Sequence, residues 1–157
     1  MMSDVEIPNF GEVLASHLTG VPPDALPYLL SQLERTAAAR YREWASQIPS
    51  HEEGLLECAA SEDEIAKRAE AMFPVSPEHR ASVDEILPAA KAAYYKVFEG
   101  YEPIDQMTIQ ANAERQGASA WQGLKAAHPD KAVQLDEISE IELKSADYLD
   151  QLLSELN

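Results

Sequence analysis

Four glutamates in this chain occupy positions that a helix in a soluble protein normally gives to apolar residues. These residues are Glu34, Glu62, Glu114 and Glu142. Each interrupts or borders an apolar stripe with the three- and four-residue spacing of a helix. Burying an unpaired carboxylate is costly, so each group would have to be protonated, paired with Arg or Lys, or bound to a metal ion. The stripes supply few cations, because Arg35 and Arg115 each follow a glutamate directly and point about 100° away from it.

The spacing of these glutamates from two prolines predicts that they lie at one height. Residues 34 and 62 are both 14 residues from position 48, just before Pro49, and residues 114 and 142 are both 14 residues from position 128, just before Pro129. If a helix turns back at each proline, every glutamate lies about 21 Å from its turn, at a rise of 1.5 Å per residue. We therefore expect the four carboxyl groups to meet inside a group of four helices.

Breaks at proline and glycine divide the chain into six predicted helices. They span about residues 10–18, 24–47, 50–73, 77–99, 103–128 and 130–156. No segment alternates apolar and polar residues, so no strand is expected and the predicted fold class is all-α. Residues 1–23 form a predicted N-terminal arm with one short helix. Residues 24–157 form a predicted bundle, with hairpins at 24–73 and 103–156 joined by a crossover helix at 77–99.

Local signals predict how several helices begin and end. Asn9 is placed to cap the first helix, and Gly20 is placed to end it. Ser50 and Glu53 have the spacing of a capping box at the start of the third helix. Pro88 predicts a kink or a break in the crossover helix, because proline removes one backbone hydrogen bond there.

The two predicted hairpins align with each other at a constant offset of 80 residues. The pair Glu34-Arg35 falls on Glu114-Arg115, Tyr41 falls on Trp121 and Pro49 falls on Pro129. Helical segments share composition, so scattered identities mean little, but a matching proline in register with a matching charged pair favours an internal duplication.

This arrangement resembles the ferritin-like superfamily. In that superfamily, two hairpins related by a pseudo-twofold axis each supply a Glu from the first helix and a Glu-x-x-His from the second. The resemblance covers about residues 24–156 and implies an up-down-down-up four-helix bundle. By position, Glu34 and Glu114 resemble the lone carboxylates, and Glu62 and Glu142 resemble the Glu of each paired motif. The four residues are thus the candidate metal ligands, and the resemblance implies Fe or Mn as the metal.

The sequence departs from the family pattern at both histidine positions. Ile65 and Ser145 stand where the two histidines would be, and no Glu-x-x-His occurs in the chain. Four carboxylates without imidazole suit harder ions better than a tuned di-iron oxidase centre. Two hypotheses follow. The favoured one is a non-catalytic scaffold or interaction protein without a cofactor, and the alternative is a carboxylate-bridged di-metal protein with oxidase, peroxide-handling or metal-holding activity.

Composition narrows the range of partners. A chain of 157 residues with 45% hydrophobic residues is long enough to fold as one globular domain, and its net charge of −16 opposes binding to nucleic acid and anionic membranes. The first residues do not read as a signal peptide, and no apolar run is long enough to span a membrane, so a cytoplasmic location is expected. A homodimer or another protein partner stays open. The histidines, expected at surface or terminal positions, are His17, His51, His79 and His128.

Overall fold

The computed structural model describes residues 5–156, which form six α-helices and, within that range, no strand. The helices are α1 (Phe10–Leu18), α2 (Leu26–Gln47), α3 (Glu52–Met72), α4 (Pro77–Lys96), α5 (Pro103–Gly123) and α6 (Ala132–Leu156). The all-α class is therefore confirmed for the described residues. Residues 1–4 of the predicted arm and residue 157 of the predicted bundle lie outside them.

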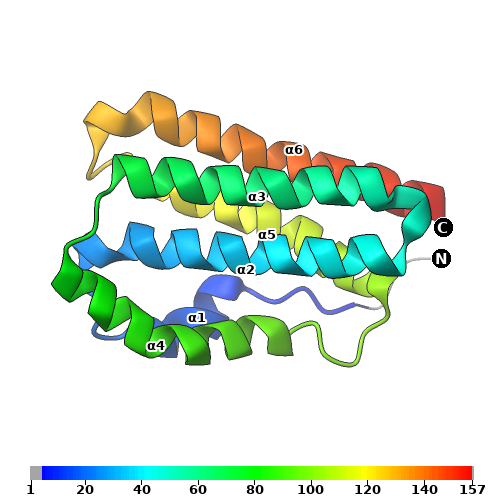
Figure 1. Cartoon of the computed structure of the whole chain (residues 1–157), viewed down its shortest axis with the longest axis horizontal. Coiled ribbons are helices and arrows are strands. Elements are labelled where there is room, and N and C mark those ends of the chain that lie inside the picture. Colours follow the sequence, from blue (N-terminus) through cyan, green and yellow to red (C-terminus); the bar gives the residue numbers. More distant parts are fainter. Residues whose placement is uncertain (1–4, 157) are drawn as a thin grey trace.

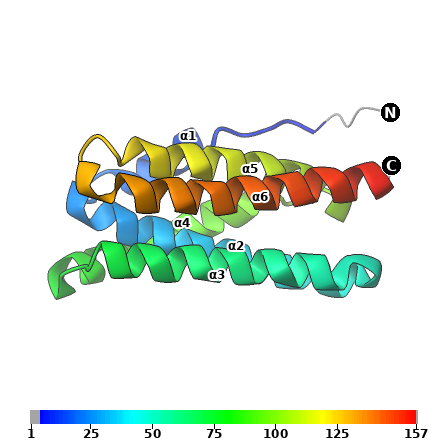
Figure 2. The ribbon, with the colours of Figure 1, turned by 90° about the horizontal axis from the view of Figure 1, so that it is seen from above.

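Two antiparallel helix pairs make up most of the molecule (Figure 1). Helix α2 packs along α3, helix α5 packs along α6, and α3 also contacts α6. Seen from above, the two pairs form two layers (Figure 2). Helices α2 and α6 run in one direction, and α3 and α5 run in the other (Figure 1).

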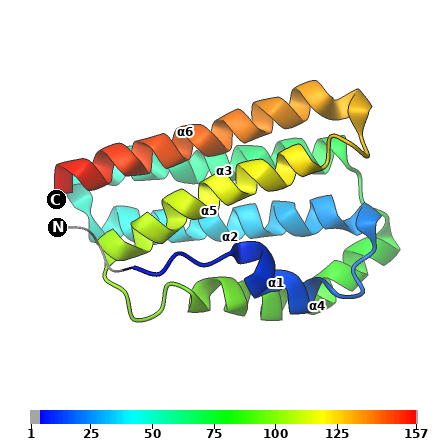
Figure 3. The same ribbon diagram turned by 180° about the vertical axis from the view of Figure 1, so that it is seen from behind.

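Helix α4 connects the two pairs. It packs against α2, and α1 packs against α4. From behind, α1 and α4 lie along the edge of the molecule that is farthest from α6 (Figure 3). The chain thus returns along its own length before the second pair begins (Figure 1). Buried apolar side chains join α2 and α4, since Leu29 and Tyr28 of α2 lie in one cluster with Val83 of α4.

Several helix ends follow the sequence signals. The side chain of Asn9 accepts a hydrogen bond from the backbone N–H of Glu12, which caps α1. Gly20 and Gly100 both have a φ of +86°, a conformation that glycine adopts without steric cost. These two residues turn the chain after α1 and after α4.

Other helix ends differ from the prediction. The expected capping box of Ser50 and Glu53 does not form, because Pro49 begins a 3-10 turn over Pro49–His51 and α3 begins only at Glu52. Helix α2 likewise starts at Leu26 after a 3-10 turn, and α5 ends at Gly123, five residues before the predicted end. Pro88 does not split α4, which is one helix from Pro77 to Lys96. Pro88 lies at an exposed position of this helix.

The interior contains two apolar clusters along the helix pairs. One cluster, toward the α2–α3 turn, includes Tyr41, Trp44 and Leu149. Another, toward the α5–α6 turn, includes Ile65, Trp121 and Ile138. The glutamates come between these clusters in sequence on three helices, so the acidic groups divide the apolar core.

None of the described helices is long and apolar enough to cross a membrane.

Candidate metal centre

Three of the four predicted glutamates are completely enclosed. The exposed fraction is 0% for Glu62, 2% for Glu114 and 1% for Glu142. Glu34 is half-buried. The four glutamates come from four different helices, α2, α3, α5 and α6. Each points inward because it lies on the helix face that its apolar neighbours define.

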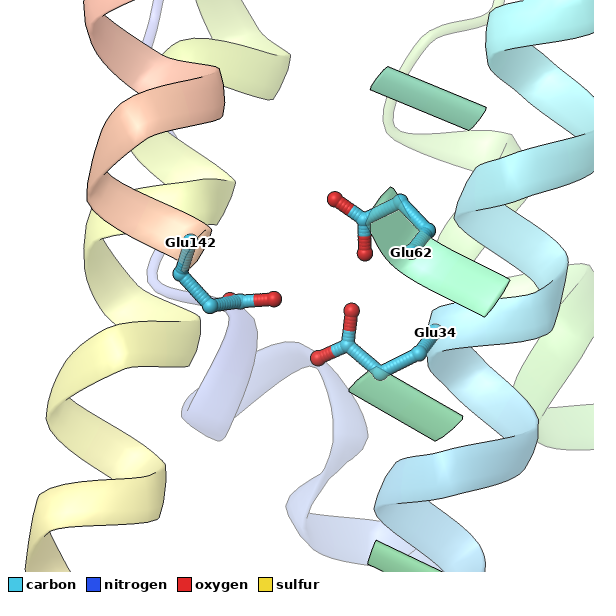
Figure 4. Close-up of side chains that lie close together, drawn as sticks. All are labelled: Glu34, Glu62 and Glu142. Atoms are coloured by element: carbon cyan, nitrogen blue, oxygen red, sulfur yellow. The ribbon is translucent and has the colours of Figure 1, made fainter. Parts of the chain in front are cut away.

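The half-buried Glu34 and two of the enclosed glutamates bring their carboxyl groups close together. Glu34, Glu62 and Glu142 each offer an oxygen, and the three oxygens lie within 4.8 Å of one another. Figure 4 shows the three side chains pointing toward a common space from α2, α3 and α6. We call Glu34, Glu62 and Glu142 the carboxylate triad. Glu114 of α5 is not part of the triad.

Glu114 is held by two hydrogen-bond donors. The Tyr41 hydroxyl donates to Oε1 of Glu114 at 2.8 Å, and Nε2 of Gln110 donates to the same oxygen, also at 2.8 Å. Gln110 is oriented in turn by Tyr94, whose hydroxyl donates to Oε1 of Gln110 at 2.7 Å. Because Tyr94 belongs to α4, the connecting helix helps to fix a carboxyl group of the core.

Glu34 receives a matching contact from the other helix pair. Nε1 of Trp121 donates to Oε1 of Glu34 at 3.2 Å. Trp121 is the counterpart of Tyr41 at the offset of 80, and Glu34 is the counterpart of Glu114. An aromatic side chain from the first helix of each pair therefore donates to the glutamate in the first helix of the other pair. On the surface, Arg35 pairs with Glu70 at 2.8 Å, and their counterparts Arg115 and Asp150 also pair.

Several buried carboxyl oxygens receive no hydrogen bond. These atoms are both oxygens of Glu62, Oε2 of Glu114 and Oε1 of Glu142. Among residues 5–156, none of the ion pairs reaches Glu34, Glu62, Glu114 or Glu142. Arg40, a buried cation of α2, stacks instead on aromatic rings, with its guanidinium carbon 4.5 Å from the centre of the Phe98 ring. Within the described residues, the buried carboxyl groups are therefore not compensated by ion pairs with Arg or Lys, which was one of the three possibilities that the sequence left open.

Burial raises the pKa values of the enclosed carboxyl groups. It raises the pKa of Glu62 well above the ordinary value of a glutamate, and the charge of Glu114 adds to this effect. It raises the pKa of Glu142 well above that value too, with a further contribution from the charge of Glu34. Burial raises the pKa of Glu114 to about 7, although its interaction with the neighbouring Glu62 carboxyl group and the hydrogen bonds from Gln110 and Tyr41 oppose the increase.

Without a cation, these shifts favour two pairs that share protons. Two carboxylates repel each other, but a protonated Glu62 can donate its O–H to Glu114, and a protonated Glu142 can donate to Glu34. Each pair joins the first helix of one helix pair to the second helix of the other. The two carboxyl pairs are equivalent at the offset of 80, since Glu62 corresponds to Glu142 and Glu34 corresponds to Glu114.

The donor set also fits a hard divalent cation. Two oxygens bound to one ion are separated by at most twice the bond length, so a limit of 4.8 Å corresponds to bonds of about 2.4 Å, within the range of Ca²⁺. The shorter bonds of a smaller ion require the flexible carboxyl groups to move closer together. Carboxylate oxygens suit Mg²⁺, Ca²⁺ and Mn²⁺. The oxygens of Glu62 have no hydrogen-bond partner and are therefore free to act as ligand atoms for such an ion. The charge of the ion would also relieve the repulsion among the carboxylates.

The sequence analysis did not predict every residue around the glutamates. Gln110 lies one helical turn before Glu114, so its position on the same face was a usable signal. The donor role of Trp121 depends on how the two helix pairs face each other, which the sequence does not reveal. The histidines behave as expected, since none of the four is buried.

Comparisons with protein families, with curated proteins and with solved structures gave no match to this chain.

Proposed function

We propose that this protein is a metal-holding helical bundle that takes up a hard divalent cation, Mn²⁺ or Fe²⁺, through its carboxylate triad. The observation that carries the proposal is Glu62. This side chain is fully buried, and neither of its carboxyl oxygens has a hydrogen-bond donor. Leaving such a group ionised and unpaired costs several kcal/mol, so a cation is the most direct compensation.

In this proposal, Glu34, Glu62 and Glu142 hold the ion, and Glu114 is the fourth carboxylate beside it. When bound, the cation supplies positive charge and Lewis acidity within the core. Tyr41 and Gln110 hold one oxygen of Glu114 and leave its Oε2 without a donor. Trp121 fixes Oε1 of Glu34 in the same way. These donors orient the carboxylates, as partners of metal ligands commonly do.

A ferritin-like four-helix bundle built from a duplicated hairpin is the architecture that we propose for residues 24–156. Its support is the set of contacts that recur at the offset of 80, namely Tyr41 with Glu114 and Trp121 with Glu34 in the interior, and the two arginine pairs on the surface. The directions of the four long helices also support it, as does the course of α4, which follows the first pair in the sequence and returns along α2 before the second pair begins (Figure 1).

The test is metal content and metal-dependent stability. Protein purified without chelator is analysed for Mn, Fe, Mg and Ca, and its melting temperature is measured with chelator and then with added Mn²⁺. An ion that binds only the folded chain stabilises it by mass action, and 100-fold excess over Kd contributes about 2.7 kcal/mol. We expect chelator to lower the melting temperature and Mn²⁺ to restore it.

A matched control is available within the chain. The double variant Glu62→Gln/Glu142→Gln should lose the response to Mn²⁺, because two ligands of the triad are replaced by amides. The double variant Glu57→Gln/Glu137→Gln changes two exposed glutamates on the same helices and should respond as the wild type does. Equal responses in both double variants, or no binding of Mn²⁺ or Fe²⁺ by the wild type, would reject the proposal.

A metal-free scaffold is the second candidate, and one observation favours it. The carboxyl groups can pair by sharing protons, Glu62 with Glu114 and Glu142 with Glu34, and no imidazole accompanies them. In that case chelator and Mn²⁺ both leave the melting temperature unchanged, and the Gln variants are at least as stable as the wild type at neutral pH.

A further inference from the structure

Gly117 of α5 lies directly beneath the carboxyl group of Glu142. A Cβ atom placed on Gly117 would lie 3.1 Å from Cδ of Glu142, and it would overlap Oε2 of the same carboxyl group. The carboxyl group of Glu142 therefore rests against the backbone of α5 in space that any other residue at position 117 would fill.

Glycine at this position has no evident helical purpose. Gly117 lies in the interior of α5, far from either end, where glycine weakens a helix relative to alanine. Its φ is not in the left-handed region, so the backbone conformation does not require glycine. Gly123, at the end of the same helix, has no atom within 4 Å of an added Cβ. Only at Gly117 does the missing side chain make room for a group of the candidate site.

The counterpart of Gly117 at the offset of 80 is Ala37 of α2, which is buried. Because Ala37 carries a Cβ, the carboxyl group of Glu62 cannot rest on α2 as closely as that of Glu142 rests on α5. The two halves of the repeat are therefore unequal at this pair of positions. The carboxyl group of Glu142 lies against Gly117 of its neighbouring helix, whereas neither oxygen of Glu62 has a hydrogen-bond partner.

We infer that Gly117 is a positioning residue that places the Glu142 carboxyl group within the carboxylate triad. A methyl group at position 117 displaces the far end of a flexible side chain and not a piece of backbone, so the fold accommodates it and the carboxyl group moves. The oxygen of Glu142 then leaves its place near Glu34 and Glu62. In its consequence for metal affinity, this inference rests on the proposed metal-holding function.

The experiment compares Gly117→Ala with Gly123→Ala, which adds the same methyl group to the same helix in open space. Mn²⁺ affinity is measured by isothermal titration and by the EPR signal of free Mn²⁺. We expect Gly117→Ala to weaken Mn²⁺ binding by roughly 10- to 100-fold, the usual effect of disturbing the support of a metal ligand. Gly123→Ala should bind as the wild type does. A purely helical role for Gly117 would change the melting temperature and leave the affinity unchanged, and that result overturns the inference.

A second readout does not depend on metal. Crystal structures of metal-free wild type and Gly117→Ala should show the Glu142 carboxyl group displaced from α5 in the variant, and an unmoved carboxyl group would overturn the inference. If the wild type binds no Mn²⁺, the proposed function fails, while this structural comparison still tests the positioning role. If Gly117→Ala folds poorly, Glu142→Ala in the same chain should restore its melting temperature, because the two substitutions share one contact. Failure of that rescue also overturns the inference.

Discussion

The hydroxyl of Tyr41 donates to Oε1 of Glu114 across the interface between the two helix pairs, over a distance of 2.8 Å. Both groups are buried, and the counterpart contact from Trp121 to Glu34 crosses the same interface in the opposite direction. These reciprocal contacts tie each helix pair to the acidic group of the other. The carboxyl groups of Glu114 and Glu34 therefore help to hold the two helix pairs together, because each accepts a hydrogen bond from the opposite pair.

Replacing Tyr41 with Phe should destabilise the protein by about 1–3 kcal/mol, the usual cost of leaving a buried acceptor without its donor. Oε1 of Glu114 would keep only Gln110. The Tyr41 hydrogen bond lowers the pKa of Glu114, so this pKa should rise in the variant. Urea unfolding and carboxyl ¹³C NMR measure the two effects. The half-buried Tyr101 provides the control, and equal losses in Tyr41→Phe and Tyr101→Phe would contradict the prediction.

Replacing Glu62 with Gln should stabilise the metal-free protein near pH 7 by about 1 kcal/mol or more, because an amide of the same shape carries no charge into the core. The folded-state pKa of Glu62 is raised, so its protonated form stabilises the fold fully only below the unfolded value of about 4.3. The benefit of Gln should therefore shrink toward zero near pH 4. Denaturant titrations at both pH values, with the exposed Glu57→Gln as control, measure this. A destabilising effect in the presence of chelator would refute it.

The metal-free wild type should become less stable as pH rises from about 4.3 through 7. Raised folded-state pKa values mean that the unfolded chain releases protons first, so unfolding becomes more favourable over this range. The pKa of about 7 for Glu114 places part of the loss near neutrality, and the raised pKa values of Glu62 and Glu142 add to the loss above the unfolded value. The net charge of −16 acts in the same direction through surface repulsion.

Salt separates the two contributions, since it screens surface charges and affects buried groups much less. Unfolding free energies at low and high NaCl should retain a common downward slope with pH, and Glu62→Gln/Glu142→Gln should flatten that slope. A slope that disappears in high salt would assign the effect to the surface alone.

The buried Cys58 should resist thiol reagents in the folded protein. Burial raises its pKa to about 12, so the reactive thiolate is scarce at neutral pH, and the side chain is enclosed in α3. Reaction with a disulfide reagent should be slow without denaturant and fast in urea. Its rate should follow the global unfolding rate or the population of the unfolded state. Rapid reaction of the native protein would mean that α3 opens locally near Glu62.

The helices could be predicted from the sequence because proline, glycine and apolar spacing act locally. The helix starts after Pro49 and Pro129 could not, because each proline begins a 3-10 turn that delays the next α-helix. A capping box needs Ser50 just before the helix, and the turn places Ser50 within itself instead. Of the two outcomes predicted for Pro88, a kink or a break, the break does not occur, because α4 continues as one helix past the proline.

The glutamates could be predicted because a charge within an apolar stripe violates the pattern around it. Their partners could not, since the donor from Trp121 and the space above Gly117 arise from the rotation of one helix pair against the other. The missing histidines favoured a metal-free scaffold in the sequence. The carboxylate triad, which none of the ion pairs among residues 5–156 reaches, shifts that preference toward a cation, because one ion would compensate three carboxyl groups at once.

Binding of Mn²⁺ should release protons from the protein. Metal ligands must be deprotonated, and burial raises the pKa values of Glu62 and Glu142 well above the ordinary value of a glutamate, so these groups hold protons more tightly in the metal-free fold than in the unfolded chain. Isothermal titration in two buffers with different ionisation enthalpies gives the number of protons released per ion. This number should fall as the pH rises, and the apparent affinity should increase. The control, Glu57→Gln/Glu137→Gln, should give the same curve as the wild type. Binding without proton release would mean that the triad is already ionised before the metal arrives, and the buried carboxyl groups would then need a compensating charge that the described residues do not provide.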